Sequence, residues 1–245
     1  MQTPRLFVSI FAYVMGKENA DPAAAVRDEL AAGENASWPA FRTLARVRAH
    51  TSPMVLMVNH SSLIGKARSL ALGAFVESGA PLWLSIDDDV EASSEDVGRL
   101  LGAEDVDVLI APCALRGGDA PQLNIAVSSS APSVRDVGAG VRAFPIVSGG
   151  FALSVMSRRA AAMLYEAHPE LRFVETSQGP RRGLGVYLEE IRDGSWWGED
   201  YAFCRRARAA GLRLEALCDT AVTHAGVVAT VDPRFFVQSD TIAPS

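Results

Sequence analysis

Short apolar runs alternate with amphipathic stretches along the first half of the chain. The apolar runs at 6–14, 54–58, 82–86 and 106–111 have the length and composition of buried strands. The stretches between them predict helices over 22–32, over 38–49, from a cap at Ser61 or Ser62 to about Ser78, and from a cap at Ser93 or Ser94 to Leu101. This alternation predicts an α/β fold with a mostly parallel central sheet and helices on both faces.

The pattern becomes looser after position 112. Clustered glycines, serines and prolines predict loops and hairpins, including an antiparallel pair formed by 124–127 and 144–154. Further helices are expected over 157–168 and 197–210, the second ending at Gly211 as its C-cap, and a last strand over 212–222. The second half therefore predicts a small antiparallel region beside the parallel sheet.

The composition is that of a globular protein in one unit. The chain has 245 residues, of which 49% are hydrophobic and 21% charged, and no linker-like stretch divides it. We therefore predict a single domain, with a nucleotide-binding half at about 1–112, an acceptor and catalytic half at about 113–230, and a tail at 231–245.

The net charge and the cysteine content indicate which binding partners and which cell compartment are expected. A formal net charge of −6 gives no overall attraction to nucleic acid or to anionic membranes, although the pairs Arg181-Arg182 and Arg205-Arg206 can still meet phosphate. The three cysteines lack the spacing of a zinc site and are an odd number, which disfavours a disulfide framework. The apolar start of the chain is too short to span a membrane. These features predict a cytoplasmic protein without stable membrane association.

The strongest chemical signal is a strand-like run that ends in three carboxylates. Trp83-Leu84-Ser85-Ile86 is followed by Asp87, Asp88 and Asp89. Open α/β sheets bind their ligands at the carboxyl ends of strands. Two carboxylates spaced two apart can hold a hard divalent cation and leave coordination positions for water and for the oxygens of a diphosphate. The pattern predicts chemistry on a nucleotide sugar.

Three segments in this order resemble metal-dependent glycosyltransferases of the GT-A fold, in particular short bacterial and phage enzymes akin to family 2. They are Ser62-Leu63-Ile64-Gly65-Lys66-Ala67-Arg68-Ser69, Ile86-Asp87-Asp88-Asp89-Val90, and Trp197-Gly198-Glu199-Asp200-Tyr201-Ala202-Phe203-Cys204-Arg205 followed by Gly211, Asp219 and His224. The second resembles the family's DxD motif. The resemblance implies a GT-A, Rossmann-like fold with the antiparallel region on the acceptor side.

The resemblance also implies roles for particular residues. Asp89 is expected to be the firmest ligand of a Mn²⁺ or Mg²⁺ ion, with Asp87 as a metal or ribose contact and His224 completing the metal shell. An acid of the pair Glu199-Asp200 is expected to be the catalytic base, and we favour Asp200. An acidic pair in the first turn of a helix also has a structural explanation, because the helix dipole stabilises it.

Further residues are expected to bind substrate. The small-residue strand 148–153 resembles one that borders the donor sugar, although a bulge in a packed sheet explains its glycines equally well. The paired Trp196 and Trp197 can form a stacking wall for a sugar or a base. His60 is expected near the nucleotide base, and residues 112–116 with Asn124 near the acceptor or sugar. The predicted substrate-binding residues are Phe11, Asn59, Arg68, Asp87, Asp88, Gly149, Gly150 and Trp197.

The predicted function is inverting transfer of a hexosyl group from a nucleoside diphosphate sugar, with a UDP-linked donor expected, to an acceptor hydroxyl. The acceptor can belong to a glycan, a protein or, as an alternative, a hydroxymethylated pyrimidine in phage DNA. A nucleotidyltransferase is a second alternative, but Phe11-Ala12-Tyr13 stands where a glycine-rich phosphate loop is expected. A non-catalytic sugar-binding domain is a third.

Overall fold

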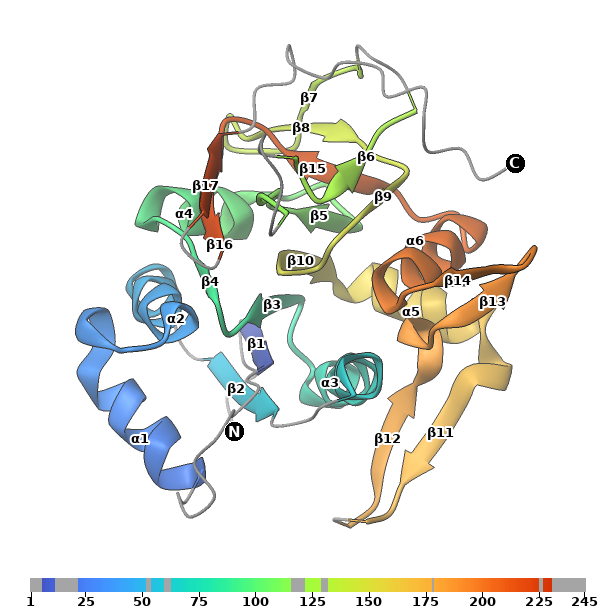
Figure 1. The fold of residues 1–245 in the computed structure, drawn as a ribbon, viewed down its shortest axis with the longest axis horizontal. Coiled ribbons are helices and arrows are strands. Elements are labelled where there is room, and N and C mark those ends of the chain that lie inside the picture. The colour runs from blue at the N-terminus through green and yellow to red at the C-terminus, as the bar shows by residue number, and fades with distance from the viewer. Residues whose placement is uncertain are drawn as a thin grey trace.

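An eight-stranded sheet crosses the middle of the protein (Figure 1). The computed structural model describes residues 6–11, 22–51, 54–59, 63–115, 122–128, 132–177, 179–224 and 227–230. The strand order is β2-β1-β3-β10-β5-β15-β8-β7. These strands are β1 (Leu6–Phe11), β2 (Met54–Asn59), β3 (Leu82–Asp87), β5 (Val108–Ile110), β7 (Arg135–Asp136), β8 (Arg142–Pro145), β10 (Leu153–Ser157) and β15 (Leu214–Leu217).

The sheet is mostly parallel, as the alternating pattern predicts. Strand β1 pairs in parallel with β2 and β3, and β5 pairs in parallel with β15. Strands β10 and β8 run against their neighbours. Because β10 lies between β3 and β5, the segment that precedes β10 reaches the same edge of the sheet as the carboxyl ends of β3 and β5.

Helices cover both faces of the sheet, which confirms the second part of the prediction. In Figure 1, α1, α2 and α4 lie on one side, and α3, α5 and α6 on the other. The helices are α1 (Pro22–Ala32), α2 (Pro39–His50), α3 (Ile64–Ser78), α4 (Ser94–Gly102), α5 (Arg158–Ala167) and α6 (Glu199–Ala209), with 3-10 turns η1 (Gly33–Asn35), η2 (Pro169–Leu171) and η3 (Gly185–Tyr187).

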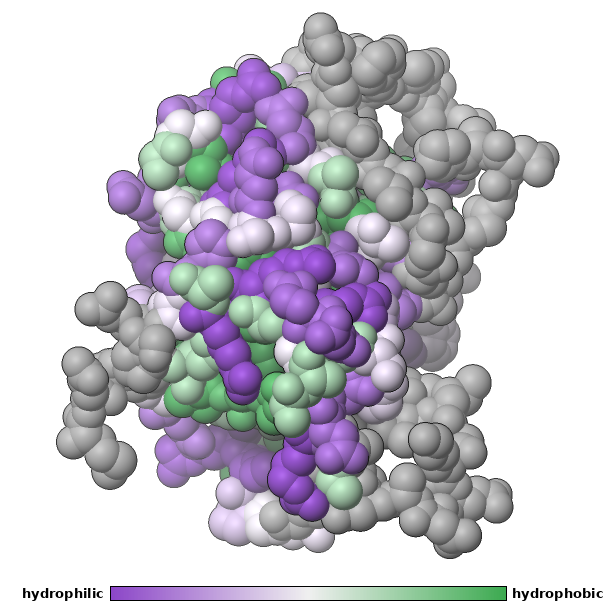
Figure 2. Space-filling view, turned by 90° about the vertical axis from the view of Figure 1, so that its left-hand side faces the viewer, coloured by the Kyte–Doolittle hydropathy of each residue, from purple (hydrophilic) through white to green (hydrophobic). Residues whose placement is uncertain are grey.

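Each face of the sheet has its own hydrophobic core. Side chains of successive strand residues point to opposite faces. Accordingly Val8 and Ile10 of β1 pack with α2 and α4, whereas Phe7 and Phe11 pack with α3, α5 and α6. Figure 2, which views the molecule from the side of α1, shows apolar residues exposed among charged ones on that surface. Burial of β1 in both cores explains why its sequence is apolar at every position but one.

Four small sheets carry the remaining strands. The predicted antiparallel pair is present as β6 and β9. The hairpins β11–β12 and β13–β14, together with the sheet β17-β16-β4, were not predicted from the sequence. The bounds are β4 (Val90–Glu91), β6 (Ile125–Ala126), β9 (Ser148–Gly149), β11 (Arg172–Glu175), β12 (Arg181–Leu184), β13 (Glu190–Arg192), β14 (Ser195–Trp197), β16 (Ala221–His224) and β17 (Val227–Thr230).

Side-chain capping explains the starts of α4 and α5. Ser93 caps α4 by accepting from the Asp96 N–H, and Ser157 caps α5 through the Ala160 N–H. The predicted cap of α3 was wrong, because Leu63 is its N-cap residue and makes no side-chain cap bond; residues 61 and 62 lie outside the described residues. The start of α3 therefore has no capping side chain, in contrast to those of α4 and α5.

Three predicted boundaries are also wrong. The last helix begins at Glu199 because Trp197 belongs to β14, and its C-cap is Ala210, with Gly211 following at φ +81°. The single strand predicted over 212–222 is two strands, β15 and β16, which join different sheets through a turn where Asp219 has φ +51°. The strand predicted over 106–111 is shorter, and residues 12–14 of the first predicted strand lie outside the described residues.

The connections of β1 leave it in opposite directions along the sheet. From β1 the chain passes through α1 and α2 to β2, and from β2 through α3 to β3, which pairs on the other side of β1. The helices before β2 and β3 cover opposite faces of the sheet. This is a topological switch point, where open α/β sheets bind ligands. Phe11 and Asp87, the last residues of β1 and β3, pair across it.

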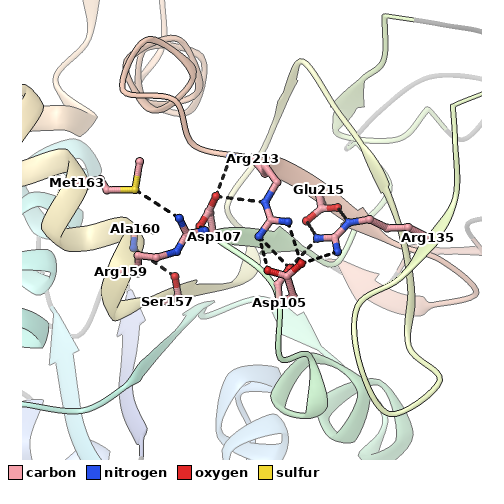
Figure 3. A network of polar contacts seen from close by, with 9 residues as sticks. All are labelled: Asp105, Asp107, Arg135, Ser157, Arg159, Ala160, Met163, Arg213 and Glu215. Carbon is pink, nitrogen blue, oxygen red and sulfur yellow. Dashed lines mark hydrogen bonds and ion pairs between the residues drawn. The ribbon is translucent and has the colours of Figure 1, made fainter.

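The opposite edge of the sheet carries a network of ion pairs (Figure 3). The buried Glu215 accepts from Nε and Nη2 of Arg135, each at 2.6 Å. The buried Asp107 is paired with Arg159 and accepts from the backbone N–H of Arg213 at 3.0 Å. Both buried acids are paired with arginines, and the exposed Asp105 pairs with Arg135 and Arg213 as well, so the network anchors the amino ends of β5 and β15.

Helix α3 packs closely against the β11–β12 hairpin at Gly73. A Cβ at this position would overlap the carbonyl group of Arg182. We expect Gly73→Ala to lower the free energy of unfolding by about 1–3 kcal/mol, measured by urea denaturation, although alanine favours helices. The control Gly102→Ala, where the nearest atom is the Ala139 Cβ at 3.9 Å, should leave stability unchanged or slightly increased. Equal effects of both changes would contradict the close packing.

Candidate active site

Acidic residues from distant parts of the chain meet at the switch point. Asp87 ends β3, and the turn that follows contains Asp88 and Asp89. The Asp88 N–H donates to the carbonyl of Phe11 at 3.2 Å, and the Asp87 N–H donates to that of Ala152 at 2.8 Å. These bonds attach the turn to β1 on one side and to the segment before β10 on the other.

The buried guanidinium of Arg68 connects this turn to the start of α6. Its side chain is 2% exposed and comes from the second turn of α3. One terminal nitrogen, Nη2, donates to both oxygens of Asp87 at 3.1 and 3.0 Å. The other, Nη1, donates to Asp200 and, at 3.2 Å, to Glu199. Three carboxylates therefore share one cation, whose Cζ lies 5.7 Å from the ring centre of Phe11.

Burial and crowding raise the proton affinity of this cluster. Burial raises the pKa of Asp200 to about 7, and the negative charges of Glu199 and Asp87 act in the same direction, while the charge of Arg68 opposes them. Burial also raises the pKa of Asp87, again against the effect of Arg68. A carboxyl group with a pKa of about 7 is half ionised at neutral pH, as a general base requires.

Backbone and aromatic groups fix the position of Asp200. The N–H of Phe151 donates to its Oδ2 at 3.3 Å. The ring of Phe151 packs edge-on against Tyr187 and Phe203, with centroids 5.7 and 4.6 Å away. A Cβ on Gly150 would lie 2.8 Å from Asn124 Nδ2 and 3.4 Å from Asp200 Oδ2. A glycine at 150 therefore lets the backbone approach the acid closely.

A second pair of side chains lies at the other end of the acidic turn. His224 Nε2 is 3.5 Å from Asp89 Oδ1, because β16 pairs with β4 directly after the turn. The His224 Nδ1 is 2.9 Å from the carbonyl oxygen of Ala114 and must donate to it, since a carbonyl can only accept. In the neutral imidazole this leaves the lone pair on Nε2 directed to the side of Asp89.

The predicted metal ligands are only partly brought together. Asp89 and His224 are adjacent, whereas both oxygens of Asp87 are engaged by Arg68. Among the described residues, no group of three or more histidines, cysteines, aspartates or glutamates is arranged to hold a metal ion. A cation at this position would thus take two protein ligands and the rest from water or substrate, an arrangement common for Mg²⁺ with phosphates.

The other predicted contacts have different surroundings. Gly149 packs among isoleucines, since a Cβ there would lie 3.0 to 3.2 Å from the side chains of Ile110, Ile125 and Ile146, as the packed-bulge interpretation expects. Trp197 is half-buried in β14, two residues before Glu199. Asn59 ends β2, but its side chain, like His60 and residue 116, lies outside the described residues.

Two residues at the site were not assigned these roles from the sequence. Arg68 was expected to bind substrate, but its guanidinium is buried between acids. Asn124 was expected to contact acceptor or sugar, but its side chain accepts from the Cys113 N–H at 3.0 Å and donates to the Gly150 carbonyl at 3.3 Å. The sequence signal for Arg68 was the excess of acids over bases in the three motifs, since carboxylates that come together away from water need a compensating cation.

Comparisons with known proteins leave the family open. No protein-family model matches the chain, and no curated protein matches it. Among solved structures, "Crystal Structure of A197 from STIV" aligns with a TM-score of 0.46 and 15% sequence identity, over 94% of this chain and 87% of that chain. A likeness at this level supports no particular activity. Among the described residues, no helix is long and apolar enough to cross a membrane.

The raised pKa of Asp200 predicts a pH-dependent stability. Between the ordinary value of 3.8 and about 7, the folded state holds this proton more tightly than the unfolded chain. The free energy of unfolding should therefore fall as pH rises through this window, by up to about 1.4 kcal/mol per pH unit from this group. Asp200→Asn should remove that slope in urea denaturation, while Asp28→Asn on α1 should keep it. Parallel slopes for Asp200→Asn and wild type would contradict the assignment.

Removing the central cation should leave its carboxylates uncompensated. We expect Arg68→Met to lower the free energy of unfolding by about 3–5 kcal/mol at pH 8, and by less at pH 5, where protonation relieves the repulsion. The exposed Arg192, which pairs with Asp193 at 3.4 Å, serves as control, and Arg192→Met should cost less than about 1 kcal/mol. Chemical denaturation at both pH values measures the difference. A loss independent of pH would point to packing alone.

Proposed function

We propose that this protein is an inverting GT-A glycosyltransferase that moves a sugar from a nucleoside diphosphate, with UDP as the expected nucleotide, to an acceptor hydroxyl. The observation that carries the proposal is the Arg68 cluster. It joins Asp87 of the acidic turn to Glu199 and Asp200 at the switch point of the sheet. Two of the three motifs that resemble this family are therefore in contact, through a residue of the third.

The charge of the site supports a requirement for a divalent cation. Five carboxylates lie in the turn 87–89 and at the start of α6, and Arg68 is the cation that contacts three of them. A diphosphate carries further negative charge and would be repelled by this site without a counterion. Asp89 and His224 are the residues that would hold Mn²⁺ or Mg²⁺, and the imidazole favours Mn²⁺. When bound, the ion would neutralise charge on the leaving diphosphate.

Asp200 is the residue that we assign as the base. It would take the proton from the acceptor hydroxyl while the hydroxyl oxygen attacks the anomeric carbon. The bond from that carbon to the diphosphate oxygen then breaks, and the nucleoside diphosphate leaves with the electron pair. A single displacement of this kind inverts the anomeric configuration. The pKa of about 7 and the hydrogen bond from the Phe151 N–H support this role.

Within this proposal we assign Arg68 a positioning role. Its two terminal nitrogens hold the strand-end acid and the base in a fixed relation, and its burial keeps it from reaching a phosphate. Phe151, whose N–H donates to Asp200, is held in place by the packing of its ring against Tyr187 and Phe203. Both features keep the proposed base in place before substrate arrives.

The proposal is tested by nucleotide binding and transfer in the full chain. We expect UDP with Mn²⁺ to raise the melting temperature and UDP alone to leave it unchanged, since binding to the native state stabilises it. Asp89→Ala should abolish the Mn²⁺-dependent shift. Asp200→Asn should retain the shift but lose sugar transfer, measured as UDP release from UDP-sugars, by at least about a hundredfold.

The control and the alternatives are read from the same measurements. Asp28→Ala, on the exposed side of α1, should behave like wild type. No stabilisation by UDP, GDP, CDP or TDP with Mn²⁺ would refute the proposal and favour a non-catalytic sugar-binding domain. Release of diphosphate from a nucleoside triphosphate would instead identify a nucleotidyltransferase.

A further inference from the structure

The β13–β14 hairpin presents two large apolar side chains to solvent. Ile191 and Trp196 are 74% and 67% exposed. They are cross-strand partners, so they lie side by side on one face of the hairpin. We call this pair the Trp196 platform. Burial of apolar surface is the main favourable term in folding and binding, so a rigid surface that leaves an indole uncovered has area available for a ligand.

Ion pairs on the other face hold the hairpin in place. Glu190, the partner of Trp197 in the hairpin, accepts from Arg205 Nε at 2.5 Å and from Arg206 Nη2 at 2.9 Å. The largely buried Arg206 also donates to the carbonyls of Val186 and Leu188, at 2.8 and 2.6 Å. The hairpin is therefore fixed to α6 and η3, and the platform keeps a defined orientation.

The hairpin that carries the platform is contiguous in sequence with the start of α6. Trp196 is followed by Trp197 and Gly198, and α6 then begins with Glu199 and Asp200. Figure 1 shows the hairpin lying beside α6. The hairpin that carries the platform therefore leads directly into the first turn of α6, which holds the residue that we propose as the base.

The groups around the platform distinguish between classes of ligand. Glu189, Arg192, Asp193 and Ser195 are exposed around it, and Arg192 pairs with Asp193. The cores of protein interfaces are depleted of such charges. A polyanion needs free cations, but Arg205 and Arg206 are engaged by Glu190. A flat aromatic face bordered by hydrogen-bonding side chains matches a neutral sugar ring, which has an apolar face and hydroxyls at its edge.

We propose that the Trp196 platform binds a pyranose ring of a neutral saccharide, which is the acceptor of this protein. The sugar's C–H face would lie against the indole of Trp196, with Ile191 extending the surface. The acceptor role rests on the proposed function, whereas saccharide binding by the platform does not. Of the predicted acceptors, this assignment favours a glycan and disfavours a hydroxymethylated pyrimidine in DNA.

Affinity gel electrophoresis of the full chain tests the platform without nucleotide or metal. Gels contain one neutral polysaccharide each (dextran, laminarin, galactomannan, xyloglucan or hydroxyethyl cellulose), alginate or double-stranded DNA. We expect at least one neutral polysaccharide to retard the protein. Trp196→Ala should weaken this binding about tenfold, and Trp196→Phe less. Val174→Ala, which truncates an exposed residue on β11, should bind like wild type.

Three outcomes would overturn the proposal. In the first, no neutral polysaccharide retards the protein; in the second, only alginate or DNA does. In the third, wild type and Trp196→Ala are retarded equally. A smaller mass in solution for Trp196→Ala would show that the platform binds a second copy of the chain. If the platform fails while UDP still binds with Mn²⁺, the transferase stands and only the acceptor class is wrong. If UDP does not bind but the saccharide does, saccharide binding by the platform stands and the transferase proposal is wrong.

Discussion

The guanidinium of Arg68 is the interaction on which the site depends. It is buried at the switch point of the sheet and forms ion pairs with carboxylates at the end of β3 and at the start of α6. An uncompensated buried carboxylate is costly, so without this cation Asp87, Glu199 and Asp200 would repel each other. The two acidic segments are distant in sequence. Their contact exists because α3 carries an arginine toward both.

The same cluster determines what the site can do chemically. Burial raises the pKa of Asp200 to about 7, and the excess of carboxylates over the single cation Arg68 adds to this rise. The raised pKa of Asp200 and the negative charge around Arg68 thus both follow from grouping acids of distant segments about one arginine. The buried acids at the opposite edge of the sheet, Asp107 and Glu215, each have their own arginine and serve only to anchor strands.

The fold was predictable where a local pattern decides it. Buried strands such as β3 read as apolar runs, and Ser93 and Ser157 mark the starts of α4 and α5 by capping. The hairpin β13–β14 was missed because its strands are three residues long and mostly exposed, so they leave little hydrophobic periodicity. Its stability comes instead from Glu190 and the arginines of α6, which are contacts between segments.

By itself the sequence determined the mostly parallel sheet, the acidic turn at a strand end and the acidic pair near Asp200, because each depends on neighbouring residues. Only the tertiary structure decided that Arg68 is buried between acids, that the β16–β4 pairing puts His224 beside Asp89, and that Trp196 stays uncovered. The physical reason is that charge compensation and exposure depend on which distant segments come into contact. The strand order in the sheet determines those contacts, and local sequence patterns do not encode the strand order.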